Sequence, residues 1–141
     1  MFFRSLRKAG LLLLAGLAFA GPASSAPAQA GAAPRLQIPR LQLDLRLGSS
    51  LDLGPQLYYQ DEDTVAIAGH RTTHTHPFLR LPSLKPGDEI RLGQSRYLVK
   101  RSRIVRPSEL WVLRYKGLVL SACHPAGSSK YRYIVFATKA P

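Results

Sequence analysis

Cysteine is almost absent from this chain: its 141 residues include only Cys123, so no internal disulfide can form. This count excludes the disulfide-rich scaffolds that many small secreted domains use for stability. A lone thiol is either a buried structural side chain or a reactive group. Cys123 is therefore a candidate functional residue, and a buried structural role is the alternative.

Acidic residues are also scarce. The chain has 8 Asp and Glu residues against 20 Lys and Arg residues, which gives a formal net charge of +12 at pH 7. Such a charge suits anionic surroundings: nucleic acid, wall polymers, phospholipid headgroups or acidic peptides. The N-terminal segment, considered next, indicates export and so argues against nucleic acid. A solvated basic surface that keeps the domain soluble is the other explanation.

Long apolar runs are missing as well. The run Ala9–Ala20 is shorter than the roughly 20 residues of a spanning helix, and Pro22 closes it. Three basic residues lie within residues 1–8, and small-residue cleavage sites follow the run, as in a secretory signal. We expect residues 1–34 to be a signal peptide or short N-terminal anchor plus a linker, and residues 35–141 to be the folded domain. The expected location is extracytoplasmic, either secreted or membrane-anchored at the cell surface.

No amphipathic helix longer than about two turns is evident, which argues against a helical fold. Short apolar runs separated by Gly and Pro turn signals predict an all-β class, a small closed barrel with short helical turns. Residues 107–111 predict one such turn, and residues 57–59 fit either a helical turn or an edge strand. The expected strands are Leu41–Leu47, Thr64–Ala68, Ile90–Leu92, residues 96–105, Leu118–Cys123 and Tyr131–Thr138.

The apolar run that ends at Cys123 predicts a buried strand, and the Pro/Gly/Ser segment after it predicts a loop. Arg132 lies nine residues after Cys123, at the start of the next apolar run. Adjacent antiparallel strands lie about 4.8 Å apart. A strand–loop–strand unit therefore brings the Cys123 sulfur and the Arg132 guanidinium to the same end of a sheet.

A third strand-like run, Thr64–Ala68, is followed by Gly69, His70 and Arg71. A thiol, an imidazole and a guanidinium at strand ends form a candidate cysteine-nucleophile site. Cys123 would attack a carbonyl carbon as the thiolate, which nearby cations favour. His70 would exchange the proton. Arg132 would donate to the oxyanion or hold the substrate's carbonyls, with a fixed fork of donors that Lys cannot copy.

The histidines admit a second hypothesis. His70, His74 and His76, together with Cys123 or His124, contain residue types that bind zinc. The spacing of the first two belongs to a helix, whereas the Thr and Pro residues around them predict a loop. We therefore expect no metal and no cofactor. His74 and His76 are expected to be polar loop residues, and His124 to point away from the Cys123 sulfur because strand side chains alternate.

Two separated segments resemble the histidine and cysteine regions of the sortase family, most closely its class E enzymes. The order His, Cys, Arg and the nine-residue interval between Cys123 and Arg132 agree with that family. Residues 36–41 also resemble its first strand, so the resemblance spans roughly residues 35–138. The segments that carry it are Ala66–Thr73 with residues 77–78 and 84–90, and Val119–Pro125 with Arg132 and residues 133–135.

The resemblance implies an eight-stranded β-barrel cysteine transpeptidase. Sortases cleave a sorting signal of the LPxTG type, here LPxTG or LAxTG, after its Thr, and an amine resolves the thioacyl enzyme. By motif position Cys123 is the nucleophile, His70 the acid/base and Arg132 the substrate and oxyanion group. The implied partners are surface proteins with a C-terminal sorting signal and an amine acceptor, a cell-wall precursor or pilin-type lysine. A membrane surface is a further candidate partner; nucleic acid is not expected.

Five further residues are candidate substrate contacts: Ala122, His124, Trp111, Thr72 and Thr73. Enzymes that this chain resembles commonly carry Thr just before the cysteine, where this chain has Ala122. Core packing is the alternative role of Trp111, because large aromatic side chains dominate cores as well as binding sites.

Two other functions compete with transpeptidation. The first keeps the enzyme but changes the acceptor, as in a water-resolved thiol peptidase or a wall cross-linking transpeptidase. The second is a non-catalytic basic β-barrel that binds cell-wall polymer or lipid. Thiol reactivity near neutral pH distinguishes the enzymes from the binding module.

Overall fold

The structure is a computed structural model, and it describes residues 31–73 and 75–141. Residues Ala32–Pro141 form one compact unit. The signal or anchor expected within residues 1–34 lies almost entirely outside the described residues. Within the described part of the chain, no helix is both long and apolar enough to cross a membrane.

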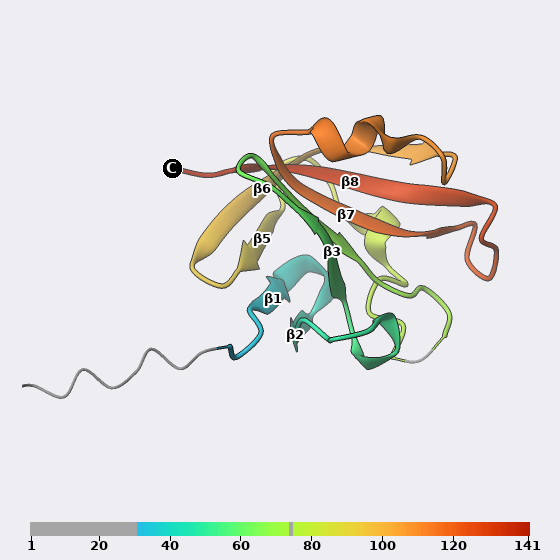
Figure 1. Cartoon of the computed structure of the whole chain (residues 1–141), viewed down its shortest axis with the longest axis horizontal. Helices are drawn as coiled ribbons and strands as arrows, with labels where there is room; N and C mark the ends of the chain where they lie inside the picture. Colours follow the sequence, from blue (N-terminus) through green and yellow to red (C-terminus); the bar gives the residue numbers. More distant parts are fainter. Residues whose placement is uncertain (1–30, 74) are drawn as a thin grey trace, which may run out of the picture. The chain divides into compact units, whose positions relative to one another are not determined.

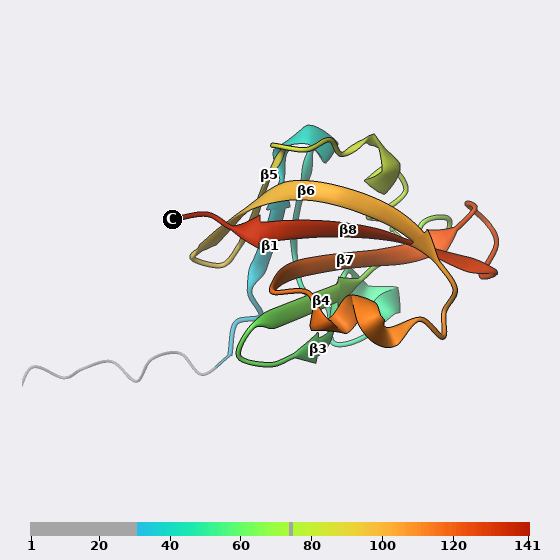
Figure 2. The same cartoon turned by 90° about the horizontal axis from the view of Figure 1, so that it is seen from above.

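Eight strands form a single sheet in the order β2-β1-β5-β6-β8-β7-β4-β3, which confirms the all-β class. Figure 2 shows β6, β8, β7, β4 and β3 side by side in that order. The strands are β1 (Arg35–Ile38), β2 (Leu43–Arg46), β3 (Gln56–Gln60), β4 (Thr64–Ala68), β5 (Glu89–Leu92), β6 (Ser95–Val105), β7 (Gly117–His124) and β8 (Tyr131–Lys139). The short 3-10 helices are η1 (Pro39–Leu41), η2 (Leu51–Leu53), η3 (Leu81–Ser83) and η4 (Leu110–Arg114).

The sheet curls strongly, as Figure 1 shows. Its ladder runs from β2 to β3, and among the described residues these two end strands do not pair with each other. The sheet is therefore a curled half-barrel. The connection between β2 and β3 joins the edges, and within it the Gly48 N–H donates to the Pro55 carbonyl at 2.8 Å.

Most expected strands coincide with observed ones, with β4 matching residue by residue. Residues 57–59, which the sequence left undecided, belong to the edge strand β3. The run expected at Leu41–Leu47 is shortened to β2, because Pro39–Leu41 forms η1 and Gln42 adopts a left-handed φ of 51°. The helical turn expected at residues 107–111 begins later, at Leu110.

The sheet buries side chains on both faces, so its strands carry two sets of core residues. The inner cluster, on the concave side, is large and includes Leu120, Ala122 and Val135. The outer cluster lies under η4 and includes Val119, Ile134 and Phe136. Because side chains alternate along a strand, Cys123 follows Val119 and Ser121 onto the outer face.

Candidate active site

Cys123 and Arg132 are direct partners in the antiparallel β7–β8 ladder. Side chains of directly opposite residues lie on the same face of a sheet, with Cβ atoms about 4.5–5.5 Å apart. The structure thus brings these two residues together, as the strand–loop–strand pattern predicts. Cys123 is partly exposed, so its sulfur is not sealed in the core.

The loop that joins β7 to β8 holds the Arg132 guanidinium. Its Nη1 donates to the Ser129 carbonyl at 2.8 Å and to the Tyr131 carbonyl at 3.0 Å. A guanidinium has five N–H donors, more than these bonds use. Arg132 is therefore fixed by its own loop and keeps donors for a ligand.

His70 reaches the Cys123 end through a parallel pairing of β4 with β7. Ala68 is the partner of Ser121, and the Gly69 N–H donates to the Ser121 carbonyl at 3.0 Å. His70 follows Ala68 by two residues, as Cys123 follows Ser121. His70 and Cys123 therefore lie on the same face, each two residues beyond Ala68–Ser121, the last pair between β4 and β7. A bond from the Phe78 N–H to the His70 carbonyl, at 3.0 Å, holds the chain there.

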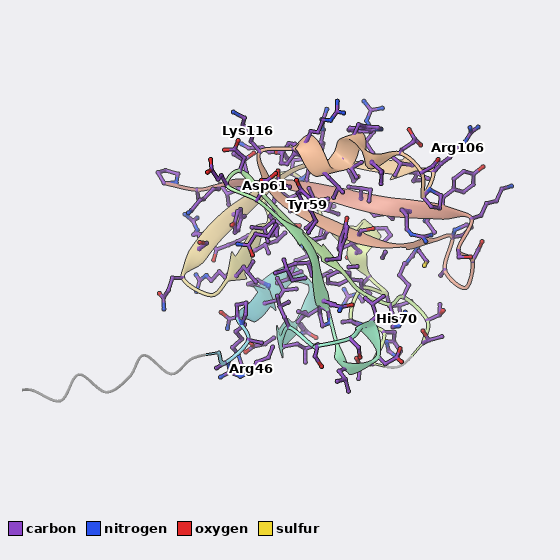
Figure 3. All side chains as sticks on the ribbon, viewed as in Figure 1. Arg46, Tyr59, Asp61, His70, Arg106 and Lys116 are labelled. Carbon is purple, nitrogen blue, oxygen red and sulfur yellow. The ribbon has the colours of Figure 1, made fainter. Side chains whose placement is uncertain are left out.

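Asp52 was not found by sequence reasoning, yet it contacts His70. Its Oδ1 lies 3.2 Å from His70 Nε2, and the two side chains are 64% and 25% exposed respectively. Figure 3 shows His70 next to the η2 turn that carries Asp52. The two residues are eighteen positions apart, so no local pattern pointed to this pair.

Arg71 links the loop after β4 to the end of β7. Its Nη1 donates to the Cys123 carbonyl at 3.3 Å and lies 3.1 Å from His124 Nδ1. Because arginine only donates, Nδ1 must be the unprotonated nitrogen of His124. The His124 ring also lies 5.7 Å from that of Tyr133, which packs against the inner cluster. His124 thus points away from the face that carries Cys123.

A cavity of about 290 Å³ lies on the outer face beside Arg132. Its floor is Ala68, Ser121 and Ile134, the outer-face residues of β4, β7 and β8. Leu51 and Tyr58 form one wall. The opposite wall comes from the segment between β6 and the end of η4, namely Val105, Arg106, Pro107, Glu109, Leu110, Val112 and Leu113. We call this cavity the outer groove.

A β-bulge directs Tyr58 into the outer groove. The β3–β4 register shifts between Leu57 and Tyr59, so Tyr58 is the extra residue. Tyr59 packs against the outer cluster, and Tyr58 lines the groove on that same face. Burial raises the pKa of the Tyr58 phenol, while a hydrogen bond with Ser121 and the charge of Arg132 oppose the rise.

A larger cavity, of about 550 Å³, lies at the other end of the sheet. Its lining includes Gly117, the first residue of β7, together with the acidic turn Asp61, Glu62 and Asp63. Figure 3 shows Asp61 at the end of the sheet remote from His70. This cavity is therefore not part of the Cys123 site.

The five expected substrate contacts are not brought into the outer groove. Ala122 is 3% exposed in the inner cluster, since alternation turns it away from the face of Cys123. Trp111 stacks on Phe136 at 5.9 Å and is 40% exposed. Thr72 and Thr73 are exposed in the loop after β4, outside the groove lining.

The zinc hypothesis involves His74, which lies outside the described residues. Over residues 31–73 and 75–141, no group of three or more His, Cys, Asp and Glu side chains has the geometry of a metal site. His70 contacts Asp52, and His124 contacts Arg71.

Comparisons with known proteins agree with this geometry. Residues 36–140 match the family model described as a sortase domain. Sortase E1 of Streptomyces coelicolor is 36% identical over 86 residues, a match that covers 50% of this chain and 24% of that relative. The chain thus spans about a quarter of that relative's length.

Two solved structures share the fold. The crystal structure of sortase E1 from Streptomyces coelicolor with a tripeptide in its active site superposes with a TM-score of 0.66 at 26% identity, covering 77% of this chain and 87% of that one. Sortase C-1 from Actinomyces oris superposes with a TM-score of 0.68, also at 26% identity, covering 77% and 73%.

Proposed function

Because this chain belongs to the sortase family, we propose that it is an exported cysteine transpeptidase that acts on an LPxTG- or LAxTG-like sorting signal. The observation that carries the proposal is the pairing of Cys123 with Arg132 across β7 and β8, with His70 at the same end. Arg132 lines the outer groove, whose volume of about 290 Å³ suits a short peptide segment.

The reaction begins with attack of the Cys123 thiolate on the carbonyl carbon of the signal's Thr. Arg132 donates to the oxyanion that forms, and His70 protonates the amine that leaves. The products of this half are a thioester on Cys123 and a free C-terminal peptide. An acceptor amine then attacks the thioester and loses a proton to His70, which restores the Cys123 thiolate and the protonated His70 and gives a new amide bond.

The outer groove is suited to the residues before the scissile bond. Its walls and floor are largely apolar, with Leu51, Ala68 and Val105 among them, and Arg132 lies at one side. An apolar lining with a few fixed donors is typical of peptide and ligand sites. Leu and either Pro or Ala of the signal would pack there while Arg132 holds a carbonyl.

The proposed partners follow from the same chemistry. Surface proteins with a C-terminal sorting signal supply the acyl group, and a cell-wall precursor or a pilin-type lysine supplies the amine. The location is extracytoplasmic, with residues 1–34 as signal or anchor. A water-resolved peptidase and a non-catalytic barrel remain the competing functions, and one experiment separates all three.

The purified protein is incubated with LPxTG and LAxTG peptides, with and without an added amine, and analysed by mass spectrometry. A thioester on Cys123 that the amine converts to an amide product supports transpeptidation. Hydrolysis that the amine does not divert supports the peptidase. The Cys123→Ala variant should give neither adduct nor product. If no peptide gives an adduct and folded Cys123 also resists alkylation, the thiol is structural. That result would support the non-catalytic binding barrel.

A further inference from the structure

Asp52 is held in place by a compact connection between β2 and β3. The Gly48 N–H donates to the Pro55 carbonyl at 2.8 Å, and the Leu53 N–H donates to the Ser50 carbonyl at 3.1 Å. A Cβ on Gly48 would lie 2.9 Å from the Leu53 carbonyl carbon, so the turn closes tightly on itself. Leu51, the neighbour of Asp52, lines the outer groove. The backbone therefore fixes Asp52 at the edge of this groove.

The contact between Asp52 and His70 defines which ring nitrogen carries hydrogen. An ionised carboxylate only accepts, so the His70 Nε2 that lies 3.2 Å from Asp52 Oδ1 must be the N–H. The other nitrogen, Nδ1, then has the lone pair in the neutral ring. This contact thus defines the tautomer of the imidazole and contributes to its orientation.

Exposure limits what this contact contributes to stability. The Asp52 side chain is 64% exposed and that of His70 is 25% exposed. Even a charged pair that is open to water contributes little to the free energy of unfolding. A role in orienting His70 is therefore the better account of the pair than a role in holding the fold.

Other acids are poorly placed for this task. Glu109 lines the outer groove, but its carboxylate accepts from the Arg106 N–H at 2.5 Å and from Trp111 Nε1 at 3.3 Å. Asp61 lies on the turn at the far end of the sheet (Figure 3). Asp52 is the carboxylate that contacts the imidazole.

We propose that Asp52 is the positioning residue for His70: it binds Nε2–H and thereby directs Nδ1 to the proton transfers of the reaction. This inference rests on the proposed function, because it assigns the orientation of that site's acid/base. Asp52 touches neither the acyl group nor the amine, and acts only through the imidazole.

A double-mutant cycle tests this with the full-length protein. Turnover on the sorting-signal peptide is measured for wild type, Asp52→Ala, His70→Ala and the double variant, with unfolding curves for each. Asp52→Ala should lower kcat with KM nearly unchanged, by up to roughly 10²-fold, the cost of a misplaced catalytic group. In the His70→Ala background the same change should have no further effect, because the residues act as a unit. The matched control is Asp63→Ala, which removes the same charge from an exposed turn residue 3.8 Å from Lys116 and should leave kcat unchanged.

Added formate provides a second readout, since a small carboxylate can occupy the space left in Asp52→Ala. Saturable recovery of kcat in Asp52→Ala, and none in His70→Ala, supports the proposal. Equal losses from Asp52→Ala in both backgrounds would overturn it while leaving the transpeptidase function intact. An inactive wild type that forms no adduct on Cys123 would instead overturn the proposed function, and this inference with it.

Discussion

Strand pairing and hydrogen bonds together position Arg132. The ladder places its Cα opposite Cys123, and the carbonyls of Ser129 and Tyr131 hold its Nη1. A lysine at this position keeps the charge but cannot both satisfy those carbonyls and present a planar fork to a substrate.

We therefore expect Arg132→Lys to retain the fold and lose most activity. Removal of one oxyanion donor costs on the order of 10²–10³ in rate. Urea unfolding and peptide turnover are measured on the same sample, with Lys130→Arg, two positions away on the loop, as the control. Near-normal turnover in the Lys variant would exclude Arg132 from the site.

The burial of Ala122 gives a second prediction at this scale. The side chain is 3% exposed and packs in the inner cluster. Ala122→Thr adds two heavy atoms, a methyl carbon and a hydroxyl oxygen, to that packing, so the free energy of unfolding should fall by about 1–3 kcal/mol. The thermal midpoint of the variant, compared with that of the exposed control Ala126→Thr, checks this. An unchanged thermal midpoint together with faster turnover would instead indicate that the side chain at position 122 contacts the substrate.

The position of each site residue depends on the strand or loop that carries it, and Gly69 is an example. It joins β4 to His70, and a Cβ there would lie 2.6 Å from the buried Phe78 ring. The absence of a side chain lets the loop after β4 fold back over the strand end.

Gly69→Ala should therefore push against the Phe78 ring, displace His70 and destabilise the domain by about 1–3 kcal/mol. Activity should fall more than stability alone explains. Gly87→Ala is not a suitable control, because its φ of 91° adds backbone strain. The double variant Gly69→Ala/Phe78→Leu is the better comparison, since the smaller side chain makes room. If that double variant recovers no activity relative to Gly69→Ala, the contact with Phe78 is not the cause of the loss.

The turn between β3 and β4 is held by Asp61. Its carboxylate accepts from the Tyr59 hydroxyl at 2.7 Å and from the N–H groups of Asp63 and Thr64 at 2.9 and 2.7 Å. The Tyr59 bond, followed by these backbone bonds, lowers the pKa of Asp61 below its ordinary value.

A carboxyl whose pKa is lower in the folded state stabilises the fold above its unfolded pKa, about 3.9, and this contribution is lost as pH falls through the folded value. Asp61→Asn should consequently destabilise the domain at pH 7, and the difference from wild type should shrink in acid. Urea unfolding at several pH values measures it, with Glu62→Gln as the control for charge on the same turn. A difference that stays constant down to pH 2 would mean that ionisation of Asp61 does not stabilise the turn.

The sequence predicted those elements that depend on neighbouring residues and missed those that depend on distant contacts. The apolar run before Cys123 and the turn before Arg132 were sufficient for β7 and β8 and for their pairing. Tyr58 depends on a bulge against β4, and Asp52 depends on a turn that reaches His70 from another part of the chain. Neither has a local signal. Ala122 is different, since strand alternation applied to Cys123 already assigns it to the other face.

The distribution of charge is a property of the whole molecule. Residues 100–116 contain six Lys and Arg residues and one acid, Glu109. Figure 3 shows Arg106 and Lys116 on the side of the sheet that η4 covers. A surface of one sign attracts polyanions over about a Debye length, roughly 8 Å at physiological ionic strength.

The full-length protein should therefore bind phosphatidylcholine vesicles that contain phosphatidylglycerol more tightly than pure phosphatidylcholine vesicles, and added salt should reduce the difference. The pure phosphatidylcholine vesicles are the control for binding through the apolar N-terminal run. Arg103→Gln/Arg114→Gln should weaken the anionic component more than the control Arg80→Gln/Lys85→Gln. Equal effects of the two pairs, measured by co-sedimentation, would show that overall charge and not this segment attracts the surface.

Because β4 pairs in parallel register with β7, the chain tolerates a change in length less well in β4 than in the loop between β7 and β8. An extra residue inside β4 would turn the imidazole to the opposite face, because each residue added to a strand reverses its side chains. An extra residue beside Gly127, at the tip of the loop between β7 and β8, meets open space and lengthens a loop whose closure costs only about 0.6 kcal/mol per doubling. Insertions and deletions that arise in this gene would thus survive at the loop tip and be eliminated in the strand, so the reactive pair can persist while this loop changes in length.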